Sequence, residues 1–321
     1  MTYASGSLIV DDDYNIFATG NAAGTGDNNV ANVNTIWGTG ILDKGWGQST
    51  TVSPVSAGAT VTATQWATLF TRVTSIANQT NTSIVALTNP VAGDVIAFKG
   101  GFSTNLSDCF TNRNNASGVG AAITAGGVAT RSTSWVTALT ATHTITFADA
   151  NAARYFFNAG GRITWAGARS GGTASTKNTS WTDLLTACGT LNWTTGTSIQ
   201  TIAGADYTGT TKTGGSGTPT TLSTGVGFYD LTTTDQEVFK QFASTYLYTT
   251  NYVSINIKAN AAAGSATTVT LTVRFDDSHS LNTDELVDGT LTSTVTLVQP
   301  STTYLTNTWG TPTISSSITG S

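Results

Sequence analysis

Two histidines are the side chains of this sequence that could act as catalytic bases. A nucleophilic serine, threonine or cysteine needs such a base within reach, and His143 and His279 are the two histidines of the chain. His279 lies in the polar segment Asp276–Ser280, beside serine and aspartate. Catalytic triads are spatial constellations that sequence neighbours rarely form, so we expect no triad there. His143 falls in a predicted strand, which favours a structural role.

An acidic cluster is the second candidate for chemistry, and its members are Asp276, Asp277, Asp284, Glu285 and Asp288. A glycosidase needs two carboxylates roughly 5 to 9 Å apart, and calcium needs several oxygen ligands. The spacing does not match an EF-hand loop, and a solvated acidic loop between two strands explains it without any chemistry. A depolymerase that uses Asp276 and Asp277 is the enzymatic alternative.

Other signatures of catalysis and cofactor binding are absent from the sequence. It contains no G-x-S-x-G nucleophile elbow, no P-loop and no Rossmann fingerprint. Cys109 and Cys188 have no CxxC motif or Cys/His cluster around them, which argues against zinc. We expect them to be free buried thiols, with a disulfide between them left open. The sequence therefore predicts no catalytic residues, no cofactor and no metal, and a protein that is not an enzyme.

The composition excludes several classes of protein. Charged residues make up only 10% of the chain, the net charge is -5, and roughly one residue in five is threonine. The aromatic share of 9% argues against disorder, and the few basic residues argue against a nucleic-acid partner. No apolar run reaches the roughly 20 residues of a membrane span, and we expect no signal peptide. A neutral, hydrogen-bonding surface suits permanent assembly or an extracellular location.

Most of the helical signal lies near the N-terminus, and we predict a helical docking region over residues 1–90. Three aspartates at Asp11–Asp13 favour a helix start, because they complement its exposed N–H groups. The clearest helix is predicted over Thr64–Asn78, with Thr64 as its N-cap. One apolar stripe follows the helical period and is either core or a subunit contact. As a candidate assembly face it comprises Trp66, Leu69, Phe70, Val73 and Ile76.

Tryptophans in aromatic and glycine-rich segments form a second candidate surface. Trp37 and Trp46 are followed directly by glycine, and Trp193 precedes a threonine- and glycine-rich stretch. Sugars stack on aromatic faces, so Trp37, Trp46 and Trp193 are candidate contacts for a partner or a host surface glycan. For Trp37 and Trp46, burial in a small core is the alternative interpretation.

After a predicted linker over residues 78–95, helices and loops alternate with extended structure. Asp149 is predicted to cap a short helix over Ala150–Asn158. The segment Ser180–Asp183 indicates a capping box at the start of another helix. A glycine- and threonine-rich stretch over residues 196–224 is predicted to be a long loop or flap.

Alternating apolar and polar residues predict strands in the same region. A long strand is predicted over Thr133–Phe147, and three further strands have apolar residues at every second position, around Val253–Ile257, Val269–Phe275 and Leu291–Leu297. Antiparallel sheets with one solvated face have this alternation. The predicted fold is mainly β (α+β): a small helical N-terminal region, then an antiparallel β-sandwich-like domain with a few short helices over residues 91–321.

Four groups of segments cover most of the chain in order: Asn34–Gly40 with Asp43–Gln48 and Val61–Trp66; Ala153–Gly161 with Ser170–Gly172; Asn178–Trp181; and Val287–Thr292 with Pro300–Tyr304. They resemble virion structural proteins of tailed phages, most closely those of contractile-tailed cyanophages and other marine phages. The block Arg154–Asn158 is the most specific part of the resemblance.

The resemblance implies a virion component without catalysis, assembled in the host cytoplasm and located in the virion. A tail-apparatus part such as a neck, baseplate or fibre component is expected, with other virion proteins as partners and a homo-oligomeric state. Capsid decoration and carbohydrate-binding receptor recognition are the alternatives.

Overall fold

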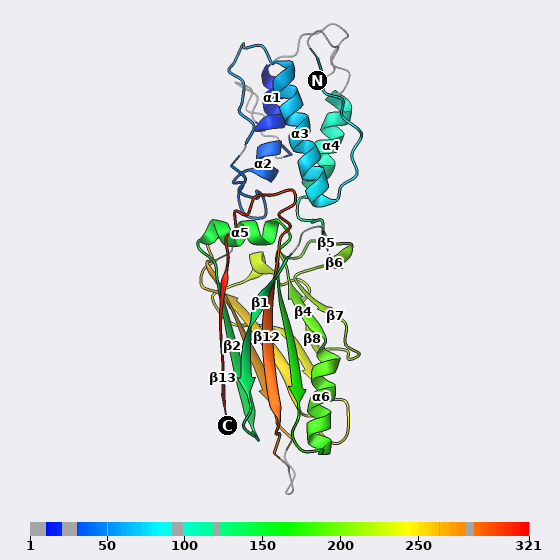
Figure 1. The fold of residues 1–321 in the computed structure, drawn as a ribbon, viewed down its shortest axis with the longest axis vertical. Coiled ribbons are helices and arrows are strands. Elements are labelled where there is room, and N and C mark those ends of the chain that lie inside the picture. The colour runs from blue at the N-terminus through cyan, green and yellow to red at the C-terminus, as the bar shows by residue number, and fades with distance from the viewer. Residues whose placement is uncertain are drawn as a thin grey trace.

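The computed structural model describes residues 11–20, 31–49, 51–91, 99–118, 122–262, 264–279 and 286–320. The molecule is elongated, with a helical end and a sheet end whose strands run along the long axis (Figure 1). The helices are α1 (Asp11–Ala18), α2 (Val33–Trp37), α3 (Ala63–Thr80), α4 (Lys99–Thr111), α5 (Ala150–Asn158), α6 (Thr176–Cys188) and a 3₁₀ helix, η1 (Phe228–Asp230). The strands are β1 (Ala122–Arg131), β2 (Ala138–Thr146), β3 (Arg162–Ser170), β4 (Thr190–Trp193), β5 (Gln200–Ile202), β6 (Ala205–Tyr207), β7 (Thr210–Thr213), β8 (Thr221–Leu222), β9 (Gln236–Phe242), β10 (Tyr252–Ala259), β11 (Thr268–Asp276), β12 (Thr290–Gln299) and β13 (Thr313–Gly320).

The central helix of the helical end is α3. It confirms the predicted helix and extends it by one residue at the start and two at the end. The N-cap is Thr62, and the prediction of Thr64 was wrong. The Thr62 side chain accepts a hydrogen bond from the Gln65 N–H, and the Gln65 side chain accepts one from the Thr62 N–H. This reciprocal capping box satisfies the N–H groups of Thr62 and Gln65. Thr64 cannot be the N-cap, because it already lies inside the first turn of α3.

The apolar stripe of α3 forms the core of the helical end. Trp66 packs edge-on against Tyr14 and Phe17 of α1 and against Phe102 of α4. Helices of the same chain thus cover the stripe, and its side chains expose 2% of their surface or less. The core interpretation is confirmed, and the predicted assembly face is wrong for Trp66, Leu69, Phe70, Val73 and Ile76.

The helical end continues beyond the predicted boundary at residue 90. Helix α4 packs beside α3, and its Phe102 and Leu106 are buried. Gly100 and Gly101 lie in its first turn, and glycine is a poor helix former, so the sequence pattern did not indicate this helix. Residues 92–95 of the predicted linker lie outside the described residues.

Two antiparallel sheets form the sheet end, which confirms the predicted sandwich-like fold. One has the strand order β1-β12-β3-β4-β7, and the other has β13-β2-β11-β10-β9-β8. Their inner faces belong to a hydrophobic cluster that continues into the helical end. At one side β1 lies next to β13, where a Cβ on Gly127 would meet Ile314 at 2.4 Å. Strands β1, β9 and β13 were not predicted.

Threonine and serine line most of the outer face of three adjacent strands of the six-stranded sheet, β11, β2 and β13. Thr144 of β2 lies between Thr270 of β11 and Ser315 of β13, and the neighbouring rows repeat this arrangement. The intervening Ile145 and Leu271 point inward and are fully buried. The predicted alternation of apolar and threonine faces is therefore confirmed, although β2 is shorter than the strand predicted over residues 133–147.

The remaining helices and loops agree only in part with the predictions. Asp149 accepts a hydrogen bond from the Ala152 N–H at 2.7 Å and caps α5 as predicted. Helix α6 begins earlier than predicted, with Ser175 as its N-cap, so the capping box at Ser180–Asp183 was wrong. The predicted long loop over residues 196–224 contains the short strands β5 to β8.

Candidate functional site

The tryptophans predicted to contact a glycan or partner are buried. Trp37 exposes 4% of its surface, and Trp46 and Trp193 expose 1% each. The rings of Trp37 and Trp46 meet edge-on, 6.0 Å apart. A ring without an exposed face cannot stack on a sugar. The prediction of a surface at Trp37, Trp46 and Trp193 is therefore wrong, and the core interpretation of the first two is confirmed.

The loop at residues 39–46 joins the helical end to α5. Arg154 donates to three backbone carbonyls of this loop: Nε to Leu42 at 3.1 Å, and Nη2 to Thr39 at 3.2 Å and Lys44 at 3.0 Å. Asn158, one turn later, donates to the carbonyls of Leu42 and Gly45, both at 3.0 Å. Both side chains are buried. We call this contact between residues 39–46 and Arg154 and Asn158 the waist joint.

The waist joint also holds the segment that leads to β13. The Trp46 indole donates to the Asn158 carbonyl at 3.1 Å, and Thr308 Oγ1 donates to the Trp46 carbonyl at 2.6 Å. Gly47 has a φ of +68°, and a Cβ there would lie 2.3 Å from the Tyr155 ring. Only glycine fits this close approach in the left-handed conformation. The segments Asn34–Gly40 and Asp43–Gln48 thus pack against Ala153–Gly161.

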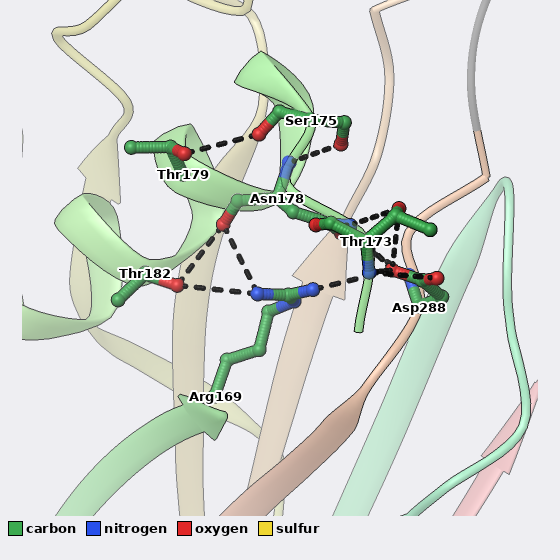
Figure 2. Close-up of polar contacts among 7 residues, drawn as sticks. All are labelled: Arg169, Thr173, Ser175, Asn178, Thr179, Thr182 and Asp288. Carbon is green, nitrogen blue, oxygen red and sulfur yellow. Dashed lines mark hydrogen bonds and ion pairs between the residues drawn. The ribbon is translucent and has the colours of Figure 1, made fainter. Parts of the chain in front are cut away.

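A second polar contact lies at the opposite end of the sandwich, where β3, α6 and β12 approach each other. Figure 2 shows Arg169, Thr173 and Asn178 directed at the carboxylate of Asp288. The Thr173 N–H donates to Asp288 at 3.0 Å, Arg169 Nη2 does so at 3.4 Å, and Asn178 Nδ2 forms a further hydrogen bond. The Asp288 N–H donates in return to Asn178 Oδ1 at 3.1 Å. We call Arg169, Thr173, Asn178 and Asp288 the clasp.

In the clasp, the carboxylate of Asp288 binds the loop between β3 and α6 by hydrogen bonds and by the charge of Arg169. Burial raises the pKa of Asp288, but hydrogen bonds from Thr173 and Asn178 and the charge of Arg169 outweigh it and leave that pKa below its ordinary value of 3.8. The carboxylate is therefore charged at neutral pH. The segments around residues 170–172, 178–181 and 287–292 meet here.

The acidic cluster does not form one site. Asp276 is bound by Arg274 Nε at 2.6 Å, Asp277 by Lys177 Nζ at 2.6 Å, and Asp288 belongs to the clasp. Asp284 and Glu285 lie outside the described residues. Each described carboxylate thus has a cation of its own, which is typical of structural ion pairs.

The histidines are not assembled with an aspartate into a triad. His143 Nε2 lies 2.8 Å from Ser293 Oγ, and its Nδ1 lies 2.7 Å from Ser316 Oγ. His143 and Ser293 have no exposed surface, so substrate cannot reach them. Burial lowers the pKa of His143 to about 4, which keeps it neutral, and the expected structural role is confirmed. His279 Nδ1 lies 3.5 Å from Thr250 Oγ1.

Both cysteines are free and buried, as expected. Burial raises the pKa of each thiol to about 12, so neither is a thiolate at neutral pH. Among the residues that the structure describes, no three His, Cys, Asp or Glu side chains form a group suited to a metal ion. No helix within the described ranges is long and apolar enough to cross a membrane.

Two clefts are hollowed beside the waist joint. The larger, about 540 Å³, is lined by Thr80, Asn81, Asn115, Ser117, Thr201 and Gly204, among others. The smaller, about 250 Å³, is lined by Asp43, Asn114, Thr197, Tyr229 and Asp230, among others. Tyr229 is itself part of the wall, because its hydroxyl donates toward the Leu42 carbonyl and Asn158 Oδ1.

No family model, curated protein or solved structure matches this chain. Function must therefore be argued from the residues and their geometry.

Proposed function

We propose that this chain is a non-enzymatic structural protein of a tailed-phage virion, and that it serves in the tail apparatus as a neck, baseplate or fibre component. One observation carries the proposal. The segments that resemble phage virion proteins pair with each other in space, at the waist joint and at the clasp. Those residues maintain the shape of an elongated molecule, which is the task of an assembly component.

The surface of the sheet end supports the same proposal. Its six-stranded sheet presents uncharged threonine and serine hydroxyls over three adjacent strands. Edge strand β13 contains no charged residue, although charges commonly protect a free edge from pairing with another chain. Other virion proteins or further copies of the chain are the proposed partners, and they would meet this edge rather than the apolar stripe of α3, which is buried within the monomer.

Mass spectrometry of purified, genome-filled particles of the phage that encodes this chain tests the proposal. Copy number is scaled to the major capsid protein. A copy number that is a small multiple of the tail symmetry supports a tail component. A copy number close to that of the capsid protein favours the alternative, capsid decoration. Absence from the particles, together with a strict monomer at high concentration, would contradict both.

Carbohydrate-binding receptor recognition is the second candidate, and one loop favours it. Tyr246, between β9 and β10, exposes 54% of its surface, and the adjacent Leu247 exposes 70%. Tyr246 has a φ of +57°, a conformation that costs energy in a non-glycine residue. An exposed aromatic ring held in this way can stack on a sugar. Binding on an array of host polysaccharides that Tyr246→Ala removes is the expected result, and silence of the array for the wild-type chain excludes the candidate.

A further inference from the structure

A lysine and an aspartate are buried together near the end of the sandwich that holds the clasp. Lys177 lies in the first turn of α6, and Asp277 directly follows β11. Lys177 Nζ is 2.6 Å from Asp277 Oδ2, and neither side chain has any exposed surface. Charged side chains are almost never buried to this extent unless they are paired, and removing both charges from water is costly even for a pair.

The groups around Asp277 hold its carboxyl group in one orientation. Asn251 Nδ2 donates at 2.6 Å to Asp277 Oδ1, the carboxyl oxygen that does not contact the lysine. Asn251 is itself fixed, because its Oδ1 accepts a hydrogen bond from the His279 N–H at 2.9 Å. The Asp277 N–H donates to the Thr137 carbonyl at 2.6 Å, and the Tyr248 ring centroid lies 5.9 Å from Lys177 Nζ. The amine and the carboxyl group thus meet in a protein-lined space.

We propose that Lys177 and Asp277 condense into an intramolecular amide bond, which covalently links α6 to the end of β11. A proton passes from the lysine ammonium to Asp277 Oδ2, which leaves a neutral amine and a carboxylic acid. Nζ then attacks Cγ and forms the C–N bond. The bond from Cγ to Oδ2 breaks, and Oδ2 leaves as water with its own proton and one from the nitrogen. No oxidant, reductant or cofactor takes part.

The surroundings favour each part of this step. The two side chains have no exposed surface, so water does not compete with the amine for the Asp277 carboxyl group. Holding the reacting groups in contact replaces a bimolecular encounter by an effectively unimolecular one. As Nζ attacks, negative charge develops on Oδ1, and the Asn251 Nδ2–H already points at that atom, as a donor of an oxyanion hole does.

Such a bond would stabilise a chain whose two cysteines are free. It connects segments that are far apart in sequence, and a cross-link of this kind restricts the unfolded chain. Its position is next to the clasp, because Lys177 precedes Asn178. The inference is independent of the proposed virion function.

Intact mass measured on the purified full-length chain, unfolded in acid, tests the proposal. The expected mass is that of the sequence less one water molecule. Proteolysis should release a branched peptide that joins the segments containing Lys177 and Asp277, and trypsin should not cut after Lys177. The full sequence mass with cleavage after Lys177, or loss of water without the branched peptide, would overturn the proposal.

A second lysine–aspartate pair in the same protein is the matched control. Lys258 and Asp235 lie 3.1 Å apart, but their side chains are 38% and 48% exposed. Water reaches both groups and competes with the amine for the carboxyl group, so their peptides should remain linear. Lys258→Met should keep the loss of water, whereas Lys177→Met should show its full sequence mass.

Two further variants separate a chemical role from a structural one. Asp277→Asn can form the same amide with ammonia as the leaving group, so its mass should fall by one ammonia molecule instead of one water molecule. Asn251→Ala should be folded by circular dichroism but form the bond more slowly in a time course of intact mass. Formation at the wild-type rate would remove Asn251 from the mechanism. The wild-type mass decides the proposal even if a variant fails to fold.

Discussion

The waist joint and the clasp each contain an arginine, and the two arginines bind different kinds of acceptor. Arg154 in the waist joint is buried and donates to neutral backbone carbonyls. Arg169 in the clasp meets a carboxylate, Asp288, whose side chain is 26% exposed. The carboxylate of Asp288 is partly open to water, whereas Arg154 exposes only 6% of its surface. The comparison teaches that access of water, more than formal charge, determines how much each contact contributes to stability.

The largest expected effect is the loss of the waist arginine. Arg154→Met removes the donors to the backbone carbonyl groups of residues 39, 42 and 44, and each polar group left without a partner and away from water costs about 1–3 kcal/mol. We expect the free energy of unfolding to fall by roughly 3 kcal/mol, measured by urea denaturation. Arg131→Met is the control, because Arg131 makes only an exposed contact with the Thr133 carbonyl. Equal effects of the two substitutions would contradict the comparison.

His143, which lies between the two sheets with Ser293 and Ser316, is a second buried polar group whose contribution to stability can be measured. The pKa of His143 is lowered by burial from 6.5 to about 4, so the unfolded chain binds a proton in this interval while the folded chain does not. Stability should therefore decrease as the pH falls from 6.5 to about 4. The His143 contribution to this decrease should be roughly 3 kcal/mol.

The measurement is the free energy of unfolding as a function of pH for the wild type and for His143→Gln. The variant should show a flatter dependence over this interval, because glutamine does not titrate. Identical pH profiles would contradict a neutral buried histidine.

A pair of glycines with the same backbone conformation compares the two regions directly. Gly47 at the waist has a φ of +68° and Gly171 near the clasp has a φ of +69°. A Cβ on Gly47 would strike the Tyr155 ring, whereas a Cβ on Gly171 would have no heavy atom within 4 Å. Gly47→Ala should cost about 2–4 kcal/mol, from strain and overpacking together, and Gly171→Ala about 1–2 kcal/mol. Thermal unfolding of the two variants gives the comparison, and a larger loss at Gly171 would reverse it.

The smallest expected effect belongs to Asp288. Its folded pKa lies below its ordinary value of 3.8, so its contribution is complete above that pH and is lost as the pH falls through the folded value. Asp288→Asn should lower the melting temperature slightly at neutral pH, and the difference from wild type should shrink below pH 3.8. A difference that persists in strong acid would show that the charge of Asp288 is not what closes the clasp.

Local patterns in the sequence determined several elements of this protein. The apolar stripe of α3, the Asp149 cap of α5 and the alternation in β10, β11 and β12 were predicted, because each depends on residues within a few positions of one another. Local patterns failed for α4, which begins with glycines, and for β13, whose serines give little contrast between its two faces.

Only the tertiary structure decided which surfaces are covered and which polar groups meet. From the sequence alone, the apolar stripe of α3 and the side chains of Trp37 and Trp46 could belong either to a core or to an interface. In the structure, neighbouring elements of the same chain bury them. Arg154 and Leu42 are 112 positions apart, and Asn178 and Asp288 are 110 apart. A periodic pattern specifies the backbone conformation and the face that avoids water, but not the partner that covers it. Those contacts, and the burial of Lys177 against Asp277, exist only once strand register has brought distant segments together.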